Sequence, residues 1–131
     1  MAGILYIVPT PVGNLEDMTF RAIRVLKEAD LILAEDTRTS SVLLKHYEIK
    51  GRLESHHKFN EHKTASMIKE RILSGLNVAL ISDAGTPGIS DPGEEIVKVA
   101  IENEIEIVPI PGACAFVNAL IASGFSTREF S

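Results

Sequence analysis

Asn77 to Glu95 reads NVALISDAGTPGISDPGEE, and the rest of the chain can be interpreted outward from this stretch. Residues 78–81 form a short apolar run of the length and composition typical of a buried parallel strand. Residues 82–90 contain too much Gly and Pro for a helix or a strand. A helix then begins near Asp91, which suits the N-cap, and Pro92, which suits the first helical position. The stretch therefore predicts a strand, an open glycine-rich loop and a helix.

The predicted loop has the features of a ligand-binding loop. In an open α/β sheet, such a loop lies at the carboxyl end of its strand, where ligands bind. Gly85 and Gly88 would let a ligand approach the main chain closely. Asp83, directly after the strand, is placed to accept hydrogen bonds from hydroxyl or ammonium groups. Because glycine-rich turns between strands and helices are common, the stretch alone leaves an ordinary turn equally open.

Strands and helices alternate along the whole chain. Besides 78–81, we expect strands at 4–8, 31–34, 52–56 and 105–108, and helices that end near residues 29, 47, 73, 103 and 123. Asp17 or Thr19 can cap the first of these helices, and Gly75 suits the C-terminal cap of the third. The side chains expected to face the core are Ile23, Leu26 and Ala29, then Ala65, Ile68 and Ile72, then Ile96, Val99 and Ala100. This alternation predicts a mostly parallel sheet with right-handed crossovers.

Composition and charge narrow the class of protein. The chain has 131 residues, of which 45% are apolar, as expected for one globular domain. No apolar run approaches the length of a membrane span, and the N-terminus lacks the basic region of a secretion signal. A single cysteine, Cys114, excludes an internal disulfide, so we expect a reducing, cytoplasmic location. With four histidines but no HExxH motif and no second cysteine, we expect no metal site. A net charge of −5 argues against strong nucleic-acid binding by this domain alone.

The prolines are distributed unevenly. All six lie in three pairs, at 9 and 11, 87 and 92, and 109 and 111, and each pair follows an expected strand. Glycines at 13, 85, 88, 93 and 112 lie in the same three segments. Three stiff, glycine-bearing loops at one edge of a sheet predict a preformed ligand cleft, although proline as a simple strand breaker is the alternative. Neither a P-loop nor a GxGxxG fingerprint is present.

Four stretches carry a resemblance to a known family. They are LYIVPTPVGNLED at 5–17, AEDTR at 34–38, ISDAGTPGISDPG at 81–93 and PIPGA at 109–113. Together they resemble the amino-terminal half of the tetrapyrrole methylase superfamily of S-adenosylmethionine-dependent methyltransferases. The second and third stretches are similar to those of a branch that methylates the ribose 2′-hydroxyl of a cytidine in small-subunit (16S) ribosomal RNA. The resemblance extends over the whole chain, in order.

The resemblance implies a fold and an assembly. It implies a five-stranded parallel sheet in the order 3-2-4-1-5, flanked by helices, in which strands four, one and five are neighbours. Residues 1–131 would be the amino-terminal α/β domain of a two-domain enzyme, whose carboxyl-terminal domain is not in this chain. S-adenosylmethionine would bind between the two domains, and the enzyme would be a homodimer. The isolated domain would therefore be inactive.

The resemblance also assigns cofactor-binding residues. It implies that S-adenosylmethionine is contacted by Val12, Asp83, Thr86, Cys114 and Ala115. Asp83 could accept hydrogen bonds from the amino or ribose groups of the cofactor, and amides at the start of the last helix could bind its polar groups. Cys114 can equally be a small buried residue on a helix face.

The segment after the second strand offers candidates for chemistry. A 2′-hydroxyl is a poor nucleophile, so a base that removes its proton would help, and Asp36 is the candidate catalytic base. Arg38 would hold a phosphate or orient the carboxylate. Two alternatives are open: Asp36 and Arg38 form a loop-stabilising ion pair, or the methyl transfer runs on proximity and alignment alone.

Residues 45–63 form the one basic stretch of an acidic chain and hold all four histidines. Within it, His56, His57, Asn60 and Glu61 are candidate contacts to the RNA substrate. The alternative is a solvated sheet edge, because charges on an edge strand discourage pairing with other chains.

Two further functions are open. A tetrapyrrole C-methyltransferase of the same superfamily is disfavoured by the AEDTR run and the long loop at 81–93. A non-catalytic ligand-binding α/β module similar to a flavodoxin or receiver domain is also possible. A receiver would need acids clustered after the first strand and a lysine after the fifth, and the sequence has neither.

Overall fold

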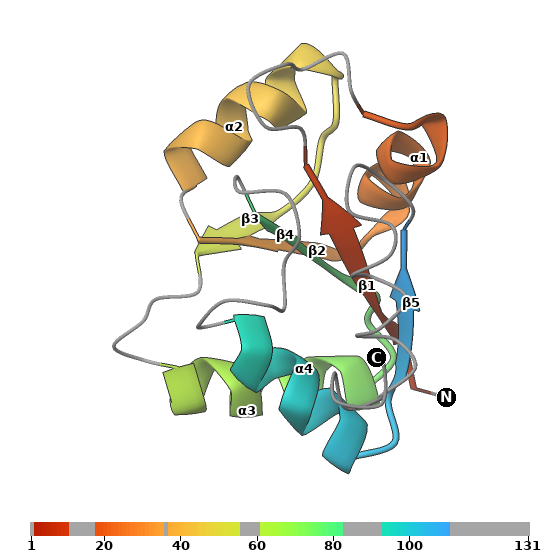
Figure 1. Cartoon of the computed structure of the whole chain (residues 1–131), viewed down its shortest axis with the longest axis vertical. Coiled ribbons are helices and arrows are strands. Elements are labelled where there is room, and N and C mark those ends of the chain that lie inside the picture. The colour runs from red at the N-terminus through yellow and green to blue at the C-terminus, as the bar shows by residue number, and fades with distance from the viewer. Residues whose placement is uncertain (1, 11–17, 36, 56–60, 83–92, 111–131) are drawn as a thin grey trace, which may run out of the picture.

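The structure is a computed structural model, and it describes residues 2–10, 18–35, 37–55, 61–82 and 93–110 (Figure 1). Strands and helices alternate through these residues as the sequence predicts. The elements are β1 (Ile4–Pro9), α1 (Phe20–Glu28), β2 (Leu31–Ala34), α2 (Thr37–His46), β3 (Leu53–Ser55), α3 (Glu61–Leu73), β4 (Val78–Ser82), α4 (Gly93–Glu102) and β5 (Glu106–Pro109). The helix expected at 113–123 lies outside the described residues.

The strands form one sheet of five strands in the order β3-β2-β4-β1-β5, and every neighbouring pair is parallel. The predicted sheet and its order are therefore confirmed. β1 lies between β4 and β5, with Leu5 opposite both Val78 and Ile107. The backbone N–H of Ile4 also donates to the Asn77 side-chain oxygen at 2.9 Å, a contact between residues 73 positions apart.

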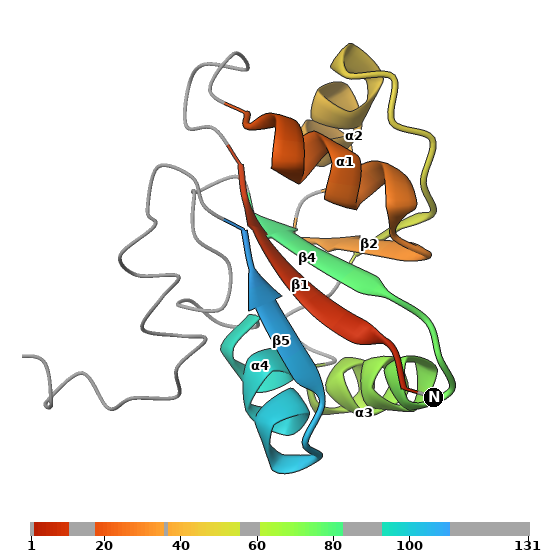
Figure 2. The same cartoon turned by 90° about the vertical axis from the view of Figure 1, so that its right-hand side faces the viewer.

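The helices cover the two faces of the sheet in pairs, α1 and α2 on one face and α3 and α4 on the other (Figures 1 and 2). Alternate strand residues therefore enter two separate cores. Toward α3 and α4, the strands contribute Leu5, Ile7, Leu31, Leu33, Val78 and Leu80. Toward α1 and α2, they contribute Val8, Ile32, Ala34, Ala79 and Ile81. The central strands are apolar without interruption because both of their faces are buried.

Neighbouring strands β1 and β4 send the chain to opposite faces. After β1 the chain continues to α1, and after β4 it continues to α4, on the other side of the sheet (Figure 2). The point at which the connections diverge is the topological switch point of an open α/β sheet, and ligands bind there, beyond the carboxyl ends of the strands. The connections diverge in this way between β1 and β4, and also between β2 and its neighbours β4 and β3.

Two helix ends were anticipated from local chemistry. Thr19, rather than Asp17, is the N-cap of α1, because its side chain accepts a hydrogen bond from Ala22 N at 3.0 Å. Gly75 ends α3 with a φ of 113°, and its N–H donates to the Ile72 carbonyl at 2.9 Å. Such a left-handed residue after a helix is usually glycine because it has no Cβ.

The structure also corrects several details. Pro9 and Pro109 are the last residues of their strands, because parallel pairing continues to them before the chain diverges. β3 is shorter than the expected 52–56 and lies at the sheet edge, with β2 as its one strand neighbour. The predicted core-facing residues of the helices are confirmed with a few exceptions. Ile23, Ala29 and Val99 are only partly buried, whereas Val25 and Val97, which were not predicted to face the core, are buried.

Candidate functional site

The carboxyl ends of β4, β1 and β5 lie side by side. Pro9, the last residue of β1, is in register with Ser82, the last residue of β4. Pro109 at the end of β5 is opposite Ile7, and the N–H of Ile110 donates to the Ile7 carbonyl at 2.9 Å. The three proline- and glycine-bearing segments therefore depart from adjacent points at one edge of the sheet. This adjacency is the geometric basis of the predicted ligand site.

Thr10 stands at this edge, directly after β1, and is buried with 5% of its surface exposed. Its hydroxyl oxygen is buried and has no hydrogen-bond partner, the one such side-chain atom found in the described residues. A buried hydroxyl without a partner costs about 1–3 kcal/mol. Sequence reasoning did not single out Thr10, because a threonine after a strand carries no signal by itself.

The segment after β2 is partly described. Glu35 is exposed, and its carbonyl accepts a hydrogen bond from the Ser55 hydroxyl at 3.3 Å, which joins the ends of β2 and β3. Arg38 is exposed in the first turn of α2. Asp36, the candidate base, lies outside the described residues. Its role, and the alternative ion pair with Arg38, stay predictions.

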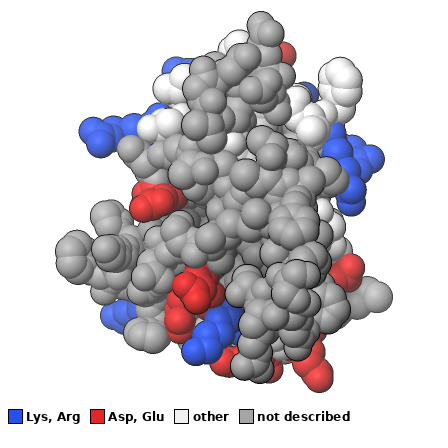
Figure 3. Space-filling view, viewed as in Figure 1, with Lys and Arg blue, Asp and Glu red and all other residues white. Residues whose placement is uncertain are grey.

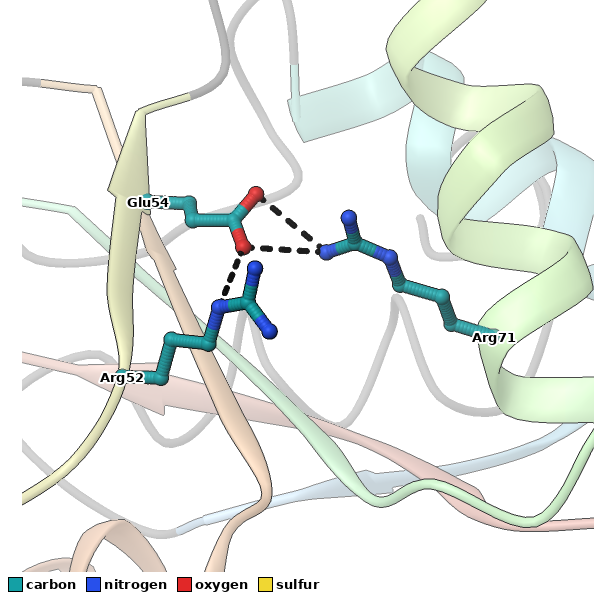
Figure 4. Close-up of polar contacts among 3 residues, drawn as sticks. All are labelled: Arg52, Glu54 and Arg71. Carbon is teal, nitrogen blue, oxygen red and sulfur yellow. Dashed lines mark hydrogen bonds and ion pairs between the residues drawn. The ribbon is translucent and has the colours of Figure 1, made fainter.

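Glu54 on β3 forms ion pairs with two arginines (Figure 4). Arg71 of α3 donates through Nη1 to both carboxylate oxygens, at 3.2 and 3.1 Å, and Arg52 Nε lies 2.9 Å from one of them. The cluster ties the edge strand to α3 and carries more positive than negative charge. Arg71 lies outside the basic stretch at 45–63, and no local pattern associates it with Glu54.

Basic side chains also gather outside that stretch. Five exposed cations lie on α1 and α2, against a single acidic residue, Glu28; they are Arg21, Arg24, Lys27, Arg38 and Lys45. In Figure 3, most of the coloured atoms along the upper margins are blue, while red and blue are mixed lower down. Residues 45–63 are therefore not the one basic feature of the chain. Arg21, Arg24 and Lys27 also lie close together in the sequence, on α1, and the description of one basic stretch left them out.

Most of the predicted contact residues lie outside the described residues. This applies to the cofactor contacts Val12, Asp83, Thr86, Cys114 and Ala115, and to the substrate contacts His56, His57 and Asn60. Glu61 is the first residue of α3. Ser82, directly before Asp83, and Ile110, four residues before Cys114, are described and lie at the carboxyl ends of β4 and β5.

Within the described part of the chain, no helix combines the length and the apolar character that crossing a membrane requires. The same residues contain no group of three or more His, Cys, Asp or Glu side chains suited to hold a metal ion.

The match to a family model assigns the chain to a class of methyltransferases. Residues 4–131 match the family of tetrapyrrole (corrin/porphyrin) methylases, and the chain belongs to this family. Membership implies S-adenosylmethionine as the methyl donor. The described residues suit such a ligand, because the strand ends meet at a switch point and present a buried hydroxyl without a partner.

The names of the curated relatives describe a narrower activity than the description of the family does. The chain is 54% identical over 128 residues to ribosomal RNA small subunit methyltransferase I of Halalkalibacterium halodurans, covering 98% of this chain and 44% of the relative. It is 52% identical over 128 residues to the protein of the same name from Synechocystis, covering 98% of this chain and 46% of the relative. The chain thus spans less than half the length of these relatives.

A solved structure supports the fold independently. The chain is similar to uroporphyrin-III-C-methyltransferase from Thermus thermophilus, with a TM-score of 0.67 and 24% identity, over 96% of this chain and 55% of that one. At this identity the likeness establishes the fold alone.

Proposed function

We propose that this chain is the amino-terminal half of an S-adenosylmethionine-dependent methyltransferase that acts on small-subunit ribosomal RNA. The observation that carries the proposal is the 54% identity, over nearly the whole chain, to a relative named for that activity. The tetrapyrrole alternative has the weaker support, since the uroporphyrin enzyme shares 24% identity and a fold alone does not specify a substrate. We further propose that the acceptor is the ribose 2′-hydroxyl of a cytidine.

The chemistry requires two things of this domain. S-adenosylmethionine, when bound, supplies a methyl group on a positively charged sulfur. Val12, Asp83, Thr86, Cys114 and Ala115 would hold it near the carboxyl ends of β1, β4 and β5. A new bond forms between the ribose oxygen and the methyl carbon as the sulfur–methyl bond breaks, and the hydroxyl proton must leave.

Asp36 would accept that proton, and Arg38 would orient the carboxylate or hold a phosphate of the RNA. The position of Arg38 supports this proposal, because it is exposed in the first turn of the helix that follows the interior strand β2. Alignment of the reacting atoms contributes as well.

The RNA would lie along basic surface. His56, His57, Asn60 and Glu61 would contact it near the substrate, and the exposed cations of α1 and α2 would attract its phosphates. Arg52 and Arg71 add positive charge beside the edge strand, although Glu54 neutralises part of it. Because the chain carries a net charge of −5, binding would depend on this local distribution rather than on total charge.

The enzyme would act in the cytoplasm, as a homodimer of two-domain subunits, and would use no metal. The homodimer is proposed from the resemblance to the family alone. Exposed apolar side chains do not form one patch, because Phe20 (94% exposed) and Val42 (60%) lie on α1 and α2, and Met67 (51%) lies on α3 at the other face of the sheet.

The direct test is the modification state of ribosomal RNA. Mass spectrometry of small-subunit RNA from cells without the full-length protein should show the loss of one 2′-O-methylcytidine. Reintroducing the wild-type protein should restore it, whereas an Asp83→Ala variant with weakened cofactor binding should restore less. Unchanged RNA, together with loss of a methylated tetrapyrrole, would favour the alternative substrate.

A further inference from the structure

Thr10 carries a buried hydroxyl whose hydrogen-bonding capacity is unsatisfied. The residue is 5% exposed, and the oxygen has no hydrogen-bond partner. Native proteins contain few such atoms, and each calls for an explanation such as an unobserved ligand. A hydroxyl both donates and accepts, so the absent partner can be of either kind.

The position of Thr10 limits where a partner can come from. Thr10 follows Pro9, which is paired with Ser82 at the junction of β1 and β4. At this junction the chain turns toward opposite faces of the sheet, which makes it a topological switch point. Ligands of open α/β sheets bind beyond the strand ends at such points. A ligand bound beyond these strand ends would therefore lie beside Thr10.

The surroundings indicate the chemistry of the ligand. The strand-end residues beside it, Val8, Ile81 and Ile110, are apolar and at most 1% exposed, because they pack in the core toward α1 and α2. None of these three neighbours carries a charge, so the Thr10 hydroxyl suits a neutral polar group of a ligand. A nucleoside offers such groups on its ribose and base, whereas a carboxylate or phosphate would favour cations or several N–H donors.

We propose that the Thr10 hydroxyl hydrogen-bonds a ribonucleoside bound at the junction of β1 and β4. The proposal rests on the proposed function, in which both the methyl donor and the RNA acceptor contain a ribonucleoside. Thr10 is thus a ligand-binding residue, and its hydroxyl gains a hydrogen-bond partner when the ligand binds.

The matched variants are Thr10→Val and Thr10→Ser, in the full-length protein. Valine keeps the branched shape and removes the hydroxyl, while serine keeps the hydroxyl and removes a methyl group. If the hydroxyl serves a ligand, Thr10→Val should leave the unfolding midpoint of the ligand-free protein unchanged or raised, because an unsatisfied polar group disappears. If the hydroxyl has a partner within the protein itself, that variant should lower the midpoint.

Binding is then measured by calorimetry with S-adenosylhomocysteine and, separately, with small-subunit ribosomal RNA. Thr10→Val should bind one of the two about 3- to 10-fold more weakly, as expected for one lost neutral hydrogen bond, and Thr10→Ser should stay close to wild type. A loss confined to S-adenosylhomocysteine assigns the ribonucleoside to the methyl donor. A loss confined to RNA assigns it to the acceptor.

Three results would overturn the proposal. One is wild-type affinity of Thr10→Val for both ligands, and another is an equal loss for valine and serine. The third is an unfolding midpoint that is lowered both in Thr10→Val and in Thr10→Ala. The smaller alanine side chain controls for a steric clash of the valine. A wild-type protein that binds neither ligand would instead refute the proposed function on which the inference rests.

Discussion

Among single residues, Gly3 lies where two segments of backbone approach each other closely, just before β1 and between α3 and β4. A Cβ added at this residue would lie 1.9 Å from the Leu76 carbonyl oxygen, and the Gly3 N–H already donates to the Ile72 carbonyl at 2.7 Å. Backbone cannot yield as a flexible side chain can. Gly3 is therefore required by contact rather than by an unusual backbone angle.

Gly3→Ala should lower the free energy of unfolding by about 3 kcal/mol, the upper part of the usual range for overpacking. Gly51→Ala is the matched control, because the nearest atom to its new Cβ is the end of the Ile32 side chain, at 2.7 Å. It should cost about 1 kcal/mol. Urea denaturation measures both, and equal costs would contradict the distinction.

Substitutions at Asp36 and Arg38 should have different effects, one on the rate of methyl transfer and the other on RNA affinity. Asp36→Asn in the full-length enzyme should lower the single-turnover rate by about 10²–10⁴-fold and leave RNA affinity nearly intact, as expected for a lost general base. Arg38→Ala should weaken RNA binding and make its salt dependence shallower by about one phosphate contact. A rate for Asp36→Asn within about threefold of wild type would exclude the base, since it falls well below that range.

Individual residues were predicted well where the signal is local. Thr19, Gly75 and the core face of α3 follow from capping rules and helical spacing. Glu48 and Glu104 have positive φ angles of 55° and 57°, and no sequence rule points to glutamate there. Thr10 and the pairing of Arg71 with Glu54 depend on what lies nearby after folding, so local patterns could not reveal them.

At the scale of elements, the N-cap of α1 offers a test of how much one local signal contributes. Thr19→Ala removes the hydrogen bond to Ala22 N and should lower the free energy of unfolding by about 1 kcal/mol. Ser66→Ala, at an exposed position inside α3, is the control and should change it little, since alanine favours helix. Thermal unfolding monitored by circular dichroism compares them. A similar loss for both variants would mean that the cap contributes nothing specific.

At the scale of the whole molecule, the sequence pattern alone yields the class of fold. The alternation of strands and helices predicts a parallel sheet, but the order of strands needs the family resemblance, because periodicity does not say which strands are neighbours. The candidate site was predicted in outline, as the edge where β4, β1 and β5 end. The cations of α1 were missed although Arg21, Arg24 and Lys27 recur every three residues, a spacing that places them on one side of a helix.

Association of subunits is a prediction at this scale. Phe20, Val42 and Met67 are more than half exposed, although they lie on three different helices. The prediction therefore rests on the family resemblance, in which this domain packs against a second domain. We expect this chain to self-associate in light scattering as its concentration rises, and the full-length protein to be a dimer. A monomer at high concentration would contradict the expectation for this chain.

The position of β1 in the middle of the sheet has a consequence for biosynthesis. Ile4 and its partner Asn77 are separated by 73 residues, and β1 pairs with β4 and β5, the last two strands of the sheet. Ribosomes add about 5–20 residues per second, so β1 leaves the exit tunnel several seconds before either neighbour is made. During that interval Leu5, Ile7 and Val8, all fully buried later, face the solvent. The nascent chain is therefore a natural client for chaperones that shield apolar segments at the ribosome.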